Sequence, residues 1–420
     1  MWIVGGVMTL FGALSLLELA QRMPKTGGPY EYFREIFGPE LAFFYGWATF
    51  IIAGAGGIAG VAFLCAHYFE ELYPLYHLSP EWESIPVHLP FVGDIFPFAD
   101  MGVKLLAAGI VLFLSGINVL GVKLGATLQS FSTTTKTIII VGIIGVVFFG
   151  GNGNTANYLY VPATAVPSGS LVAACFLALS SAFWAYDGWL NLSFIAGEVK
   201  QPAKTIPRAM LLALSIIITI YLIINFAYLY ILPVDQIATV PGGRVASAVI
   251  SAVVGKEGAL FVAALIVFSA FDCTNASILT YARLYYAMGS TGEFIKSAGR
   301  VHPKYNTPHL SLGWQCAWVL VLLFTGSFDL VTSMYVFINW LFYLLLALGV
   351  LKLWKSGVKV GLPLWIPIVF SLFSVTFLIM TLIGDIQGYQ AGREPIIKSA
   401  MGLILVLSGV PFYFYWRQKK

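Results

Sequence analysis

An aspartate and a glycine lie at the centre of an apolar run, in the stretch FWAYDGWLN from Phe183 to Asn191. A charged side chain within a membrane-length segment is costly and marks a functional site. Glycine adopts backbone angles outside the helical region, and aspartate competes with the helix for hydrogen bonds. Peptide groups freed at membrane depth are tolerated only where they are buried in protein or line a cavity. We therefore predict that Asp187 and Gly188 interrupt a membrane helix beside a polar cavity. The alternative is a kinked helix with a water-facing carboxylate.

Lys136 is a second charge inside an apolar run, in the segment QSFSTTTKTIIIVGIIGVV. Its long stem allows the ammonium group to reach the membrane surface. The alternative is an ammonium group fixed inside the protein by carbonyl oxygens and by the hydroxyls of residues 132–135, at a place where a transporter would otherwise hold Na⁺. Asp272 lies in FDCTNASILT, close to Thr274 and Asn275. It is expected to pair with Lys136, to bind water in a polar core, or to join neighbouring helices.

Other polar and small residues in apolar runs have simpler explanations. Glu18 and Arg283 lie near the ends of their runs and are expected to anchor them at the membrane surface. Asn339, in FINWLFYLLLALG, is deep in a run, so its amide needs a partner on a neighbouring helix or a polar ligand. The stretch AGAGGIAG at 53–60 is expected to let helices approach closely.

Catalytic and metal-binding groups are scarce. The five histidines do not cluster, and no H-x-x-x-H or C-x-x-C spacing occurs. The four cysteines lie in apolar runs and are expected to pack as small hydrophobic side chains, namely Cys65, Cys175, Cys273 and Cys316. An intramembrane enzyme would need a nucleophile and base, or a metal site, within the membrane. The sequence therefore indicates no enzyme, no metal and no cofactor.

The elements that must position these residues are membrane helices. Hydrophobic residues make up 59% of the 420 residues and charged residues only 10%, against about 25% in a soluble domain. A hydrocarbon core about 30 Å thick needs about 20 apolar residues as helix. We expect an all-α polytopic membrane protein, one transmembrane domain over 1–420, in the plasma or inner membrane. Its eleven predicted spans are 1–20, 39–67, 103–121, 127–150, 170–197, 208–232, 258–288, 309–325, 329–351, 364–383 and 397–416.

Basic residues predict the orientation of these spans. Of the 23 lysines and arginines, 17 fall in one set of loops and the C-terminus, and five in the opposite loops. The positive-inside rule places the first set, and the C-terminus, in the cytoplasm. Eleven spans then put Met1 outside, although an apolar run starts there at once. We therefore expect one further helix before Met1. A net charge of +4 is too small and dispersed to suggest nucleic acid.

Several motifs together resemble the L-type amino-acid transporters and their bacterial relatives, in the amino acid–polyamine–organocation superfamily. The segment 12–47 resembles that family's second helix, cytoplasmic loop and third helix. The segment QSFSTTTKTIII resembles its fifth helix, which carries a buried lysine. The segments 183–209 and 271–294 resemble its broken sixth helix and its eighth, and FINWL its tenth. The match covers essentially the whole chain in order.

The resemblance implies a LeuT-type inverted repeat that lacks its first helix in this chain, with 11 of 12 transmembrane helices. It places the site between the unwound parts of helices one and six. Phe183, Trp184, Ala185 and Asp187 would then lie on the unwound backbone of helix six, with Gly188 in the break and Trp184 capping the substrate. Lys136 matches the lysine that stands in for Na⁺, and Asn339 matches a residue near the side-chain end of the pocket. Asp272 and Thr274 are assigned supporting roles.

The implied function is sodium-independent exchange or uniport of amino acids by alternating access. Asp187 and Asp272 depart from the small residues expected there, so the alternative is a proton-coupled carrier of cationic amino acids or polyamines. Because the first helix would hold half of the carboxylate site, an N-terminally truncated, inactive relative is a further alternative. The loop at 68–102 has no cysteine, so no disulfide-linked heavy subunit is expected.

Overall fold

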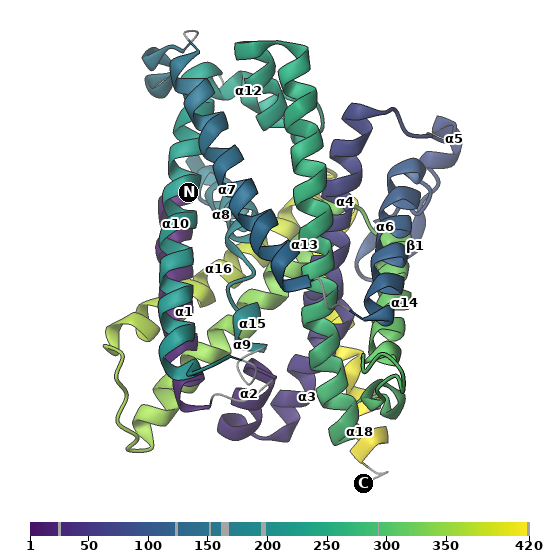
Figure 1. Ribbon diagram of the computed structural model, residues 1–420, viewed down its shortest axis with the longest axis vertical. Helices are drawn as coiled ribbons and strands as arrows, with labels where there is room; N and C mark the ends of the chain where they lie inside the picture. Colours follow the sequence, from purple (N-terminus) through teal and green to yellow (C-terminus); the bar gives the residue numbers. More distant parts are fainter. Residues whose placement is uncertain are drawn as a thin grey trace.

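The computed structural model describes residues 1–23, 27–121, 125–150, 153–160, 168–194, 199–292 and 294–417. It is a bundle of helices that run mainly along its long axis (Figure 1). The long elements are α1 (Trp2–Arg22), α3 (Pro39–Ala48), the π-helix η1 (Thr49–Ala53), α4 (Ala55–Leu72), α6 (Met101–Leu120), α7 (Gly125–Phe149), α8 (Ser168–Tyr186), α10 (Pro202–Ile231), α13 (Lys256–Thr291), α14 (His309–Thr325), α15 (Phe328–Lys355), α16 (Trp365–Gln390), α17 (Lys398–Leu407) and α18 (Gly409–Arg417).

Each predicted span contains helix among the described residues. Within the described residues, eight helical segments are long and apolar enough to cross a membrane. The other three predicted spans correspond to α7, α8 and α14, which contain shorter apolar stretches. The structure is therefore an all-α polytopic membrane protein, as the apolar runs predict. The runs form helices because a helix satisfies all its backbone hydrogen bonds internally, which the membrane requires.

The connections contain more structure than the sequence indicates. The expected loop at 68–102 holds α5 (Pro80–Glu83) and a hairpin of β1 (Val87–Leu89) and β2 (Gly93–Ile95). The hairpin is fastened to the loop before α17, because the Asp94 N–H donates to the Pro395 carbonyl (2.8 Å) and the Ile397 N–H to the Val92 carbonyl (2.8 Å). Such short elements have no periodicity from which to predict them.

Other unpredicted short elements also lie between the long helices. They are α2 (Pro29–Phe37), η2 (Thr155–Leu159), α9 (Asn191–Phe194), α11 (Val234–Ala238), η4 (Pro241–Gly243), α12 (Val245–Val254) and η5 (Lys296–Gly299). Figure 1 shows α12 and α5 towards one end of the bundle, and α2 and α18 at the other. We refer to these as the α12 end and the α2 end.

Two helices form the centre of the bundle. In the most apolar window of the segment Pro39–Leu72, 89% of residues are buried, and 72% in α15, against 11% in α10. The glycine-rich stretch at 53–60 explains how α4 packs so closely. A Cβ atom on Gly57 would lie 2.8 Å from the Tyr335 ring, and one on Gly60 would lie 2.9 Å from the Thr332 methyl group. The close approach predicted for this stretch is therefore present, and its partner is α15.

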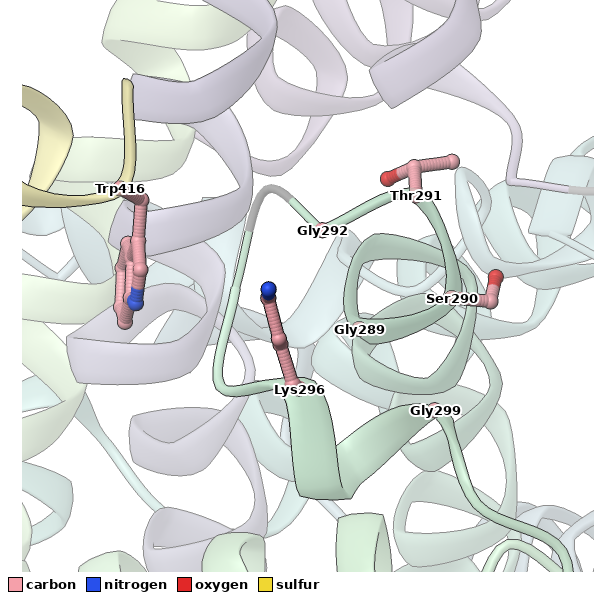
Figure 2. A pocket seen from close by; sticks show the side chains of 7 residues that line it. All are labelled: Gly289, Ser290, Thr291, Gly292, Lys296, Gly299 and Trp416. Carbon is pink, nitrogen blue, oxygen red and sulfur yellow. The ribbon is translucent and has the colours of Figure 1, made fainter. Parts of the chain in front are cut away.

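At the α2 end, the end of α13 crosses η5 with no room for a side chain. Gly289 and Gly299 line a cavity of about 420 Å³, together with Lys296 and Trp416. Figure 2 shows these residues from close by. A Cβ atom on Gly289 would overlap the backbone nitrogen of Gly299 and lie 2.9 Å from the Ala298 carbonyl carbon. Backbone atoms cannot rotate away, so this crossing requires glycine.

We predict that Gly289→Ala destabilises the protein by about 1–3 kcal/mol, as overpacking does elsewhere. Gly313→Ala in α14 is the matched control, since nothing lies within 4 Å of its Cβ position. In an open helical site, alanine is favoured over glycine by about 1 kcal/mol. Thermal unfolding of the detergent-purified variants measures both changes. An unchanged melting temperature for Gly289→Ala would mean that the crossing is looser than described.

Candidate functional site

The helix break predicted at Asp187 and Gly188 is present. Helix α8 ends at Tyr186, and α9 begins at Asn191. Gly188 has φ = +99°, a left-handed value that favours glycine. The nearest atom to a Cβ on Gly188 would be 3.9 Å away, on Asn191. The glycine is thus required by the backbone angle and not by lack of space, and the alternative of a continuous kinked helix does not occur.

The break begins later than the family resemblance implies. Phe183, Trp184 and Ala185 were expected on unwound backbone, but all three lie in the last turns of α8. None of these residue types prevents helical angles, and the first left-handed residue is Gly188. As helical residues, these three project their side chains in the directions that a helix sets. Only the carbonyl groups of the last turn of α8 lack onward helical partners.

The Asp187 carboxylate fastens the break to α15. Its Oδ1 accepts hydrogen bonds from the Tyr343 hydroxyl (2.6 Å) and the Gly188 N–H (2.6 Å), and its Oδ2 accepts one from the Asn339 amide (3.3 Å). Asn339 is only 8% exposed. A buried carboxylate is stabilised when donors occupy its lone pairs. The buried amide of Asn339 therefore has a partner, which is this carboxylate on a neighbouring helix.

A cavity of about 420 Å³ lies beside the break. Six helices and the break contribute to its wall, which combines apolar side chains with a few hydroxyl and amide groups. This composition is typical of a small-ligand site. The lining residues are Gly57, Val61, Leu64, Trp184, Ala185, Asp187, Gly188, Asn191, Tyr221, Ile266, Ser269, Ala270, Cys273, Ser277, Tyr281 and Tyr335.

The predicted site residues separate into two groups. Trp184, Ala185, Asp187 and Gly188 line this cavity. Phe183 does not: its ring lies 4.0 Å from the Trp340 ring and 5.1 Å from the Phe377 ring, centroid to centroid, in the contact between α8, α15 and α16. The Phe183 side chain thus points from α8 towards α15 and α16, away from the cavity that Trp184 lines. Phe183 and Asn339 support the wall from behind.

Lys136 and Asp272 form an ion pair between α7 and α13. The Lys136 Nζ lies 2.5 Å from the Asp272 Oδ2 and 3.3 Å from the Ser269 carbonyl oxygen. The lysine side chain is 20% exposed and the aspartate 16%. The Lys136 ammonium group is therefore fixed inside the protein, against α13. Of the three expectations for Asp272, pairing with Lys136 is the one that the structure has. The side chain of Ser132 lies outside the described residues.

Thr274 contributes less directly. It is fully buried, and its hydroxyl donates to the Ala270 carbonyl of the same helix (2.8 Å). By contrast, Ser269 and Cys273, on either side of Asp272 along α13, line the cavity. The ion pair is therefore next to the cavity wall. Among the described residues, no group of three His, Cys, Asp or Glu side chains could hold a metal ion.

Sequence reasoning missed the tyrosines of the site. Tyr335, Asn339 and Tyr343 recur every four residues and so share one face of α15. Tyr335 lines the cavity, and the other two bind Asp187. The Tyr221 hydroxyl donates to the Ala185 carbonyl (2.9 Å) and satisfies one peptide group at the end of α8. The four-residue spacing could have predicted that Tyr335, Asn339 and Tyr343 share a helix face. No sequence pattern indicates the hydrogen bond of Tyr221.

We predict strong coupling between Lys136 and Asp272. Asp272→Asn and Lys136→Met each leave a charge without its oppositely charged partner inside the membrane, and each should cost up to about 3–5 kcal/mol of stability. The double variant should be more stable than either single one. Unfolding of all four proteins measures the coupling. The exposed pair Arg34–Glu31, at 3.9 Å, is the control and should couple by less than about 1 kcal/mol. Additive losses at Lys136 and Asp272 would contradict the pairing.

We predict that Tyr343→Phe loosens the break. It removes one hydrogen bond to a buried carboxylate, which contributes about 1.5–3 kcal/mol. Tyr76→Phe, in a loop where the residue is 67% exposed, should have no measurable effect. Thermal unfolding again gives the comparison. Faster hydrogen exchange over 187–194 in Tyr343→Phe is expected, and exchange unchanged from the natural protein would count against this role.

Comparison with known proteins agrees with the motifs. A family model described as "Amino acid permease" matches residues 1–407. The serine/threonine exchanger SteT of Bacillus subtilis is 29% identical over 427 residues, covering 100% of this chain and 88% of that protein. The human b(0,+)-type amino acid transporter 1 is 27% identical over 437 residues, covering 100% and 81%. The rat large neutral amino acids transporter small subunit 2 is 29% identical over 435 residues, covering 100% and 74%. The resemblance to L-type transporters and bacterial relatives is confirmed, and this chain belongs to the amino acid permease family.

Proposed function

We propose that this protein is a sodium-independent secondary transporter that exchanges or carries amino acids by alternating access. The observation that carries the proposal is the helix break between α8 and α9, which lies beside a cavity of about 420 Å³ in the middle of a membrane bundle. Family membership and the names of the relatives, an exchanger and two amino acid transporters, support it. Those relatives are transporters and not enzymes, and we extend this to the present chain.

The break supplies a site for the ammonium group of an amino acid. The end of α8 carries the negative partial charge of a helix C-terminus, and the carbonyl groups of its last turn lack onward helical partners. An ammonium group is a donor of three hydrogen bonds and fits such acceptors. Trp184 lines the same cavity and offers a large apolar face over a bound ligand, while the hydroxyls of Ser277, Tyr281 and Tyr335 offer polar contacts.

The ion pair supports independence from sodium. Where a sodium-coupled carrier would bind a cation between helices, Lys136 places its own ammonium group against α13. Asp272 balances that charge, so the contact between α7 and α13 is complete without an added ion. A site already occupied by a covalently attached cation gives Na⁺ no differential affinity for either conformation, and coupling requires such a difference.

The carboxylate of Asp187 favours an alternative. It lies in the cavity wall, and all three hydrogen bonds given above come from neutral donors. A cationic substrate or a proton would therefore meet a carboxylate whose charge no described ion pair balances. This observation supports a proton-coupled carrier of cationic amino acids or polyamines as the second candidate. The first is favoured, because both carboxylate oxygens are already occupied by donors from α15 and the break.

The proposed setting follows from the distribution of charge and cysteine. We place the α2 end and the C-terminus in the cytoplasm and the α12 end outside, with residues 1–420 forming one transport domain. Because the outer loop at 68–102 has no cysteine, we propose that no heavy subunit is attached there by a disulfide. The name of the rat relative includes "small subunit", and this describes that protein only.

The first experiment is uptake into proteoliposomes. Labelled serine, threonine, leucine and arginine are offered with Na⁺ or K⁺ outside, at pH 5.5 and 7.5, with and without unlabelled amino acid inside. Uptake of neutral amino acids that is equal in Na⁺ and K⁺ supports the proposal. Strict dependence on Na⁺ would overturn it. Uptake confined to arginine and driven by an inward proton gradient would instead establish the second candidate.

We predict that Trp184→Ala lowers uptake efficiency at least about tenfold, equivalent to about 1.4 kcal/mol of lost interaction. The reason is loss of the apolar face over the ligand. Trp354→Ala is the control, because that tryptophan lies in the last turn of α15 and is 51% exposed. Uptake by equal amounts of reconstituted protein gives the measurement. Equal efficiency of the Trp184→Ala variant and the natural protein would remove this residue from the site.

A further inference from the structure

A separate cavity of about 240 Å³ lies at the outer ends of α4, α6, α14 and α15. The hairpin β1–β2 and the loop before α17 cover part of it. Phe63 and His67 of α4, Phe328 and Asp329 of α15, and Glu394 and Lys398 are among its lining residues. We call it the outer chamber, and the cavity beside the helix break the central cavity. The outer chamber has no role in the function as described so far.

Phe328 stands between the two cavities. It lines the outer chamber, and its ring meets the ring of Trp184, which lines the central cavity, edge to face at 5.3 Å and 86°. On the other side, the His67 ring lies 6.2 Å from Phe328 at 84°. The wall between the cavities at this point is therefore a pair of aromatic rings, with no hydrogen bond between them.

The backbone on either side of this ring is held in place. Ser327 caps α15, with its hydroxyl oxygen accepting a hydrogen bond from the Leu330 N–H (3.2 Å), and Phe328 is the first helical residue. On the α4 side, Gly60 lies beside the Trp184 ring, and its closest approach is to the Thr332 methyl group of α15, which a Cβ there would meet at 2.9 Å. A ring on a fixed backbone opens or closes the wall by rotation of its side chain, a movement that takes far less time than transport.

The charges of the outer chamber select what it attracts. Four carboxylates line it, from Asp94, Asp100, Asp329 and Glu394, against two ammonium groups. Lys398 pairs with Asp329 and Glu394 (2.9 Å to the latter), and Lys104 donates to the carbonyls of Phe96 (3.0 Å) and Pro97 (2.9 Å). The excess of carboxylates raises the local concentration of solutes that carry an ammonium group.

We propose that the outer chamber is the external access route for the amino acid, and that Phe328 is the residue that closes it from the central cavity. Ammonium-bearing solutes collect in the chamber and pass inward when the Phe328 ring leaves Trp184. The proposal rests on the proposed function for the identity of the solute. The existence of the gate does not, and it is tested without any transport measurement.

Cys273 provides the probe, because it lines the central cavity and is exposed there. The other three cysteines are replaced by alanine, and intact cells are treated with a membrane-impermeant cationic methanethiosulfonate. The reagent forms a mixed disulfide with Cys273 and releases sulfinate. Closed gates typically open in about 0.1–10% of molecules, so Phe328→Ala should raise the labelling rate at least about tenfold. Phe328→Trp should leave it equal to or below that of the parent.

Phe261→Ala is the matched control, since that phenylalanine is on the same helix as Cys273 but 64% exposed on its outer surface. Size-exclusion profiles establish that each variant is folded. Labelling from the cytoplasmic side, in inverted vesicles, should be the same for Phe328→Ala and its parent. Equal labelling from outside for both, or an increase confined to inverted vesicles, would overturn the gate. Neither outcome depends on which amino acid is carried.

The charge of the reagent tests the chamber. A cationic reagent should label the Phe328→Ala variant faster than an anionic one of similar size, after correction for their rates with a free thiol. Asp329→Asn should reduce this preference, because Asp329 is 67% exposed and contributes directly to the field of the chamber. High salt should reduce it as well. A preference that neither change alters would show that the reagent reaches Cys273 by another path.

Discussion

The backbone hydrogen bonds of a protein inside a membrane must be satisfied by the protein itself, and this requirement governs the structure. At the helix break, the Asp187 carboxylate satisfies part of it. A membrane helix that stops leaves peptide groups without partners, which is costly in lipid. Here the carboxylate accepts the Gly188 N–H and binds Tyr343 and Asn339, while Tyr221 donates to the Ala185 carbonyl. The break is thereby held open at one place, beside a cavity.

The rest of the bundle makes that cavity stable by keeping its opposite wall rigid. Helix α4 packs along α15 through glycines that leave no room for a Cβ, and α15 carries the donors for Asp187. Phe183 fixes the back of α8 among the rings of Trp340 and Phe377. Close packing of this kind resists gradual deformation, so movement is expected as rotation of whole elements or single rings.

The two acidic departures from the family pattern have different consequences. Asp272 forms an ion pair with Lys136, which joins α7 to α13 and leaves the local charge balanced. Asp187 is bound by neutral donors and faces the cavity wall. Only the second can act on a substrate's charge directly. The carboxylate that faces the cavity is therefore also the one that holds the backbone of the break.

The sequence by itself determined the membrane helices and the position of the break. Apolar runs of membrane length favour helix, and an Asp-Gly pair inside one favours an interruption of it. The motifs were sufficient to identify the family. Only the tertiary structure decided which side chains bind each other, because such contacts require helices distant in sequence to be adjacent in space. The Lys136 pair was one of several possibilities, the Tyr343 contact had only a four-residue spacing as a signal, and the side that Phe183 faces followed from where the helix ended.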